Sequence, residues 1–76
     1  MRERGVVEVF GDLGYGFIRP VAGGRNLFVH QTEIRMQGFR RLNVGDLVEY
    51  EIGPARRGGI QAVRVKLIQP AEPALV

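Results

Sequence analysis

The sequence has no cysteine, a single histidine and no long apolar run, and each of these shortages excludes a class of protein. Without cysteine there is no disulfide framework and no thiolate zinc site, and His30 has no companions that would make a metal site. No apolar stretch approaches the length of a membrane span. Residues 1–4, Met-Arg-Glu-Arg, lead directly into strand-like sequence and lack the apolar region of a secretory signal. The sequence therefore predicts a cytoplasmic protein that does not associate with a membrane.

Length and charge leave room for one small domain with a polyanionic partner. A chain of 76 residues makes at most one domain with a modest core. The net charge is +3, and arginine supplies all the basic residues except Lys66. A mild basic excess permits a nucleic-acid partner but does not require one.

Short runs of alternating apolar residues, separated by turn residues, predict five strands and little else. The predicted strands cover residues 5–10, 15–19, 27–30, 47–52 and 60–67. Residues 31–34 could form one helical turn that returns Ile34 to the core, and Val63 and Val65 are expected to point inward. Residues 36–42 are expected to form a polar loop. In so small an all-β chain, a closed or nearly closed antiparallel barrel removes exposed strand edges.

Two of these strands carry aromatic residues on the side expected to face away from the core. Successive side chains of a strand point to opposite faces. Ile18, Leu27 and Val29 occupy the core side, which leaves Tyr15, Phe17, Phe28 and His30 pointing outward. Exposed rings on a sheet, with arginines nearby, suit the stacking of nucleic-acid bases.

The same residues resemble the bacterial cold-shock proteins over residues 5–65. Gly14-Tyr15-Gly16-Phe17-Ile18 is similar to the first ribonucleoprotein-type motif of that family, and Phe28-Val29-His30 is similar to the second. Further matches are Gly38-Phe39-Arg40, Gly45-Asp46-Leu47-Val48 and Gln61-Ala62.

The resemblance implies an all-β fold: a five-stranded antiparallel Greek-key barrel of the oligonucleotide/oligosaccharide-binding (OB) type. It implies one domain over residues 1–69, and we expect residues 70–76 to be a disordered tail. The implied function is non-enzymatic, cofactor-free binding of single-stranded RNA and DNA, with pyrimidine-rich strands as candidate ligands. The implied protein is a monomeric RNA chaperone, transcription antiterminator or cold-shock response protein. The implied base-binding residues are Phe10, Tyr15, Phe17, Phe28, His30, Phe39 and Gln61, with Arg40 and Arg57 as backbone contacts.

The chain departs from the family in its first strand and in the hairpin that follows. Where the family has Lys-Trp-Phe-Asn, this chain reads Glu8-Val9-Phe10-Gly11, and the hairpin is one residue shorter. Leu13 stands where the family often has lysine, and Gln31 where many members have another aromatic. One stacking ring and two positive charges are therefore missing from the expected binding face.

For several of these residues a structural role is the alternative to a binding role. The aromatic residues could be core, His30 could be incidental, and Phe39 could cap one end of the barrel. Arg35, Arg40 and Arg41, with Arg56 and Arg57, could track phosphates or could form an ordinary solvated surface. Glu49 and Glu51 share a strand face, and without a third ligand or a base a solvated outer face is expected for them.

Two functions of different classes remain open at this point. The first is a module that binds single-stranded nucleic acid. The second is a protein-interaction barrel that kept the scaffold and lost strong nucleic-acid binding, as the absence of tryptophan would allow. An enzyme is the weakest reading, because neither a nucleophile with its base nor a metal cluster is evident in the sequence.

Overall fold

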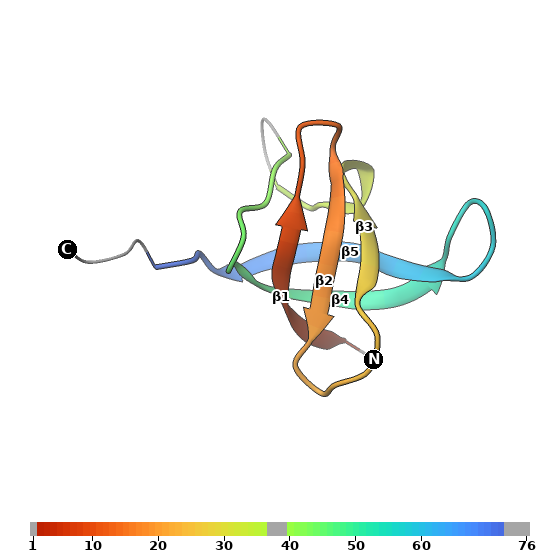
Figure 1. Ribbon diagram of the computed structural model, residues 1–76, viewed down its shortest axis with the longest axis horizontal. Helices are drawn as coiled ribbons and strands as arrows, with labels where there is room; N and C mark the ends of the chain where they lie inside the picture. The colour runs from red at the N-terminus through yellow and green to blue at the C-terminus, as the bar shows by residue number, and fades with distance from the viewer. Residues whose placement is uncertain (1, 37–39, 73–76) are drawn as a thin grey trace.

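The computed structural model describes residues 2–36 and 40–72, which form a barrel-like sheet of five strands (Figure 1). The strands are β1 (Glu3–Phe10), β2 (Tyr15–Pro20), β3 (Leu27–His30), β4 (Leu47–Pro54) and β5 (Ile60–Gln69), and the short helix η1 (Gln31–Glu33) follows β3. All five strands predicted from the sequence are present. β1, β4 and β5 extend further than predicted, because their ends continue to pair with neighbouring strands.

The strand order β3-β2-β1-β4-β5, with every pair antiparallel, gives the Greek-key arrangement. β1, β2 and β3 are consecutive neighbours, and β4 returns across the molecule to pair with the free side of β1. In Figure 1 the first three strands cross in front of β4 and β5 at a steep angle. The predicted OB-type barrel is confirmed.

The barrel is nearly closed between its two edge strands, β3 and β5. In the described part of the chain β3 lies against β5 without ladder pairing, so the sheet itself stays open. Just after η1, Ile34 forms a parallel bridge with Val65, and the backbone N–H of Arg35 donates to the Val65 carbonyl at 2.7 Å. This bridge and side-chain packing, rather than a hydrogen-bonded ladder, join the two edges at the seam.

One apolar cluster fills the barrel. Its fully buried members are Val7, Ile18, Val29, Ile34, Leu42, Val48, Tyr50, Ala62 and Val65. Ile34 is completely buried, as the sequence predicts, and Val63 and Val65 point inward. Ile52 alternates with Val48 and Tyr50 but is 49% exposed, because the β4–β5 hairpin extends beyond the barrel here (Figure 1).

A β-bulge in β1 changes the face to which its last residues point. Val7 pairs with Ile18 and Val9 pairs with Phe17, so Glu8 is an extra residue on β1. Glu8 and Val9 are both exposed, and Phe10 returns to the core with 8% exposure. The strands approach closely here: a Cβ on Gly16 would lie 1.9 Å from the Val9 carbonyl oxygen, so only glycine fits.

The turn before β4 holds the chain that leaves β5. Asp46 is buried, and its carboxylate accepts hydrogen bonds from the backbone N–H of Asn43 at 2.9 Å and of Ala71 at 2.8 Å. Ala71 lies in the segment expected to be a disordered tail, so the first part of that segment is attached to the domain. Residues 73–76 lie outside the described residues. No helix in the described ranges is long and apolar enough to cross a membrane.

Candidate nucleic-acid interface

The aromatic residues of β2 and β3 form two rows across the sheet. Tyr15 pairs with His30, and Phe17 pairs with Phe28, so these four side chains share the outward side of the pleat. We call Tyr15, Phe17, Phe28 and His30 the aromatic face. The β1 bulge adds Val9, whose Cα is the partner of Phe17 on the other side. The Phe17–Phe28 row therefore continues onto a third strand through an aliphatic side chain.

The three rings of the aromatic face touch one another and leave flat surface open to solvent. Phe28 is the central ring: its centroid is 5.7 Å from that of Tyr15 at an interplanar angle of 32°, and 5.9 Å from that of Phe17 at 73°. Tyr15 and Phe17 are 42% and 39% exposed, and Phe28 is half-buried between them. The packing holds the rings in place without hiding their faces.

The imidazole of His30 is fixed by the chain that follows it. Its Nδ1 accepts a hydrogen bond from the backbone N–H of Thr32 at 3.2 Å and lies 2.9 Å from the Thr32 hydroxyl oxygen. Nδ1 therefore acts as an acceptor and caps η1. In the neutral ring the proton then lies on Nε2, where it can be donated to a partner outside the protein.

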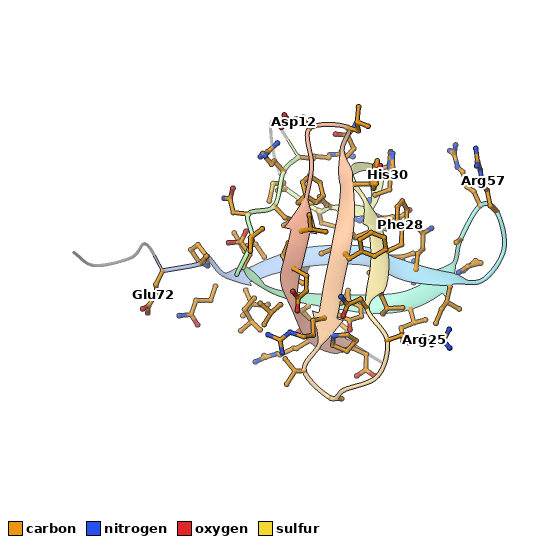
Figure 2. All side chains as sticks on the ribbon, in the orientation of Figure 1. Asp12, Arg25, Phe28, His30, Arg57 and Glu72 are labelled. Carbon is orange, nitrogen blue, oxygen red and sulfur yellow. The ribbon has the colours of Figure 1, made fainter. Side chains whose placement is uncertain are left out.

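A groove of about 650 Å³ lies beside the aromatic face. Phe28 and His30 line one side of it, and the loop between β4 and β5, including Arg56 and Arg57, lines the other. Figure 2 shows Phe28 and His30 on the side of the barrel from which this loop projects, with Arg57 on the loop. Gln61 also lines the groove, where its amide Nε2 donates to the Pro54 carbonyl at 3.0 Å.

Comparison with known proteins identifies the family to which this arrangement belongs. Residues 3–68 match the family model described as the "cold-shock" DNA-binding domain. The chain belongs to the cold-shock domain family. It is thus a nucleic-acid-binding domain.

Among its relatives are whole bacterial proteins and parts of longer plant proteins. The chain is 42% identical over 66 residues to the probable cold shock protein A of Mycolicibacterium smegmatis, covering 86% of this chain and 97% of that protein. It is 43% identical over 67 residues to the cold shock-like protein of Thermotoga maritima, covering 87% and 98%. Glycine-rich protein 2 of Nicotiana sylvestris is 48% identical over 65 residues, which cover 84% of this chain.

The chain spans about a third or less of the plant relatives, only 30% in the Nicotiana protein. Among solved structures, the one titled "drosophila Unr CSD456" superposes with a TM-score of 0.74 at 30% identity, covering 97% of this chain and 29% of that chain. That chain also contains the cold-shock fold as one part of a larger whole.

The cold-shock domain brings together most of the residues expected to bind nucleic acid, but not all of them. Tyr15, Phe17, Phe28 and His30 share one face, and Gln61 and Arg57 lie across the groove from Phe28. Arg40 is exposed in the segment before β4 and does not line the groove.

Two further aromatic residues, Phe10 and Phe39, were also expected to bind bases. The β1 bulge turns the ring of Phe10 into the core, where it is only 8% exposed, so the base-binding role that the resemblance implies for Phe10 stays a prediction. Phe39 lies outside the described residues.

Sequence reasoning did not single out two polar residues of the groove. Thr32 and Glu33, both in η1, line it beside His30. A signal was available, because a helical turn directly after His30 leaves these residues at the same end of the barrel. The orientation of their side chains depends on how the imidazole caps that turn, which the sequence pattern does not show.

The charges around the aromatic face are of two kinds. Arg19 on β2 is paired with Glu8 at 2.6 Å, and Arg41 with Asp12 at 3.1 Å near the tip of the β1–β2 hairpin. Arg56 and Arg57, on the β4–β5 loop, form no ion pair with another described residue. Positive charge that is available to a ligand therefore borders the groove.

Proposed function

We propose that this cold-shock domain binds single-stranded RNA and DNA by stacking bases on the aromatic face. The observation that carries the proposal is the group of three rings on the side of β2 and β3 opposite the core, in which Phe28 contacts both Tyr15 and Phe17 and the latter two are exposed. A ring that has no packing partner above it offers a flat apolar surface to an unpaired base. In a duplex the bases are stacked on each other and cannot reach such a surface.

The groove and its arginines give the strand a path beyond the rings. A strand stacked on Phe28 and Phe17 passes His30, whose Nε2–H can donate to a base edge, and then the β4–β5 loop. Arg56 and Arg57 can meet phosphates there, and the exposed Arg40 is a further candidate for a backbone contact. Stacking tolerates any base, so base preference is modest, with pyrimidine-rich strands favoured because they self-stack least.

Binding of this kind supports an RNA-chaperone or antitermination role. A protein that binds only unpaired strands shifts a hairpin toward its open form by mass action, by RT ln(1 + [protein]/Kd). Weak hairpins, of the sort that accumulate when cells are cooled, open first. The domain would do this as a cytoplasmic monomer and without a cofactor.

The direct test is a titration of a labelled oligopyrimidine with the purified domain at low salt, alongside a duplex of the same length. We expect saturable binding to the single strand and at least tenfold weaker binding to the duplex. The Phe17→Ala variant should bind more weakly by about 1–3 kcal/mol while remaining folded by circular dichroism. Absence of binding at high micromolar protein would instead favour a protein-interaction barrel.

A further inference from the structure

Arg19 is a cation on the same side of β2 as the stacking rings. In β2 the exposed residues alternate, and Tyr15, Phe17 and Arg19 all point outward while Gly16 and Ile18 are buried. Residues two apart in a strand are separated by about 6.6 Å. The guanidinium of Arg19 is therefore within reach of the backbone of a nucleotide stacked on Phe17.

The bulge in β1 places a carboxylate against this arginine. Without the extra residue at position 8, strict alternation would leave Glu8 and Val9 on opposite faces; with it, both are exposed. The Nε of Arg19 donates to the Glu8 carboxylate at 2.6 Å. The side chains are 57% and 42% exposed, so a ligand can reach both.

The contact is a single hydrogen bond, which leaves Arg19 able to bind a second anion. A guanidinium has five N–H donors, and within the described residues Arg19 uses only Nε. An exposed pair held by one bond contributes little stability, so a phosphate can compete for the arginine. Glu8, however, occupies the guanidinium and partly neutralises the charge that would attract the phosphate.

We propose that Arg19 is a phosphate-contact residue of the nucleic-acid face, and that Glu8 lowers affinity by engaging it until a strand displaces the carboxylate. The proposal rests on the single-strand binding proposed above. In this scheme the Arg19–Glu8 pair opens on binding, and the guanidinium turns its free N–H groups to the backbone next to the nucleotide on Phe17. The pair thus sets both the affinity and the salt dependence of the complex.

A double-mutant cycle in Glu8→Gln and Arg19→Gln tests this, with a labelled oligodeoxythymidine as the probe. Glu8→Gln should strengthen binding by about 1.5- to 5-fold. This factor corresponds to the free energy of an exposed ion pair, which the strand no longer has to break. Arg19→Gln should make the slope of log affinity against log salt shallower by about 0.7. Between 1 M and 50 mM salt, the variant should therefore gain about eightfold less affinity than the wild type. The double variant should bind like Arg19→Gln alone, because Glu8 acts through the arginine.

Two controls separate this mechanism from a change in net charge or in folding. Glu72→Gln removes the same charge at the far end of the molecule from Phe28 and His30 (Figure 2), and it should leave affinity unchanged. Thermal melting of each variant should match that of the wild type, since both residues are exposed. The resonance of the Arg19 Nε–H should shift when the oligonucleotide is added, because its partner changes.

The possible outcomes are distinguishable. If Glu8→Gln strengthens binding equally with and without Arg19, the carboxylate acts by general repulsion and the proposal is overturned. An unchanged salt slope in Arg19→Gln overturns it as well. In both cases the wild type and Phe17→Ala still report stacking, whereas a wild type that does not bind at all would remove the proposed function itself.

Discussion

The outward faces of the two halves of this barrel differ in the kind of side chain that they present. On β2 and β3 the exposed side chains are the rings and imidazole of the aromatic face. On β4 and β5 they include a group of mutually paired charges: Arg2 bonds to Glu49 and Glu51, and Arg64 bonds to Glu51 at 2.9 and 3.1 Å. We call Arg2, Glu49, Glu51 and Arg64 the ionic face. Both faces cover one continuous core.

The ionic face is organised by a second irregularity in the sheet. The register of β4 and β5 shifts between Glu49 and Glu51, and Arg64 lies at this shift with a φ of 49°. Few residues other than glycine adopt this left-handed conformation. Here it lets the Arg64 side chain reach Glu51 while its carbonyl accepts from Arg2 at 2.8 Å and its N–H donates to Glu33 at 3.3 Å.

The contrast shows how one small barrel separates binding from stability. Charges on the ionic face satisfy one another, so that face offers a ligand little unpaired charge. Among the described residues, the rings of Tyr15 and Phe17 stay partly exposed, which leaves apolar area open to water that a stacked base would cover. If this division is real, substitutions on the two faces should change different measured quantities.

The largest effect on binding should come from Phe28→Ala, which removes the central ring of the aromatic face. We expect a loss of about 1–3 kcal/mol in binding to an oligopyrimidine, because one stacking surface disappears and its neighbours lose their support. The melting temperature should fall moderately, since Phe28 is half-buried, but Leu27 and Val29 keep β3 in the core.

The matched control is Ile52→Ala, an exposed apolar side chain on β4 outside the aromatic face. It should leave affinity unchanged in a titration of the folded protein. Equal losses from Phe28→Ala and Ile52→Ala would contradict the division between the faces, because any exposed apolar residue would then serve.

Val9→Trp should extend the aromatic face by one ring and strengthen binding by about 1–2 kcal/mol, near the low end of a stacking contact. Val9 is 48% exposed and pairs with Phe17, so the new ring would continue the Phe17–Phe28 row. Stability should change by less than about 0.5 kcal/mol, as is usual at a surface position. Fluorescence titration and thermal melting of the one variant measure both quantities. Unchanged affinity in a folded protein would place position 9 outside the binding face.

Alternation of residue types was enough to predict the strands, the core side of β2 and β3, and the outward rings. It could not predict the bulge at Glu8, because an inserted residue leaves no mark in the pattern and reverses the face of everything after it. The burial of Phe10 follows from this bulge. The sequence pattern does not show the partners of Arg2 either, because Glu49 and Glu51 come next to it only through the pairing of β1 with β4. The groove depends on the conformation of the β4–β5 loop, where Gly58 and Gly59 have positive φ.

The salt dependence of binding should be shallow, because few unpaired charges border the aromatic face. With two to four phosphate contacts at about −0.7 each, log affinity should fall with log salt at a slope of roughly −1.5 to −3. Arg57→Gln should reduce that slope by about 0.7. Lys66→Gln, on β5 opposite Glu49, should not change it. A slope much steeper than −3 would mean that the ionic face also meets phosphate.

Glu51→Gln should have the smallest effect on binding, and at neutral pH we expect none. The substitution should instead change the stability of the fold. The hydrogen bond from Arg64 lowers the pKa of Glu51 below its ordinary value of 4.5, and the charges of Arg64 and Arg2 add to this. A lowered folded-state pKa means that the charged carboxylate stabilises the fold above the unfolded-state pKa. That contribution is lost as pH falls through the folded-state value. The wild type should therefore be more stable than Glu51→Gln at pH 7. The difference should begin to shrink below about pH 4.5, where the unfolded chain takes up the proton, and it should vanish only below the lowered folded-state pKa, where Glu51 is protonated in both states and resembles glutamine. Urea unfolding of both proteins from pH 7 down to about pH 3 measures the difference, with Glu72→Gln as the control for loss of charge alone. A difference that stays constant over this range would mean that Glu51 stabilises the fold by packing, and the ionic face would then owe its order to shape rather than to charge.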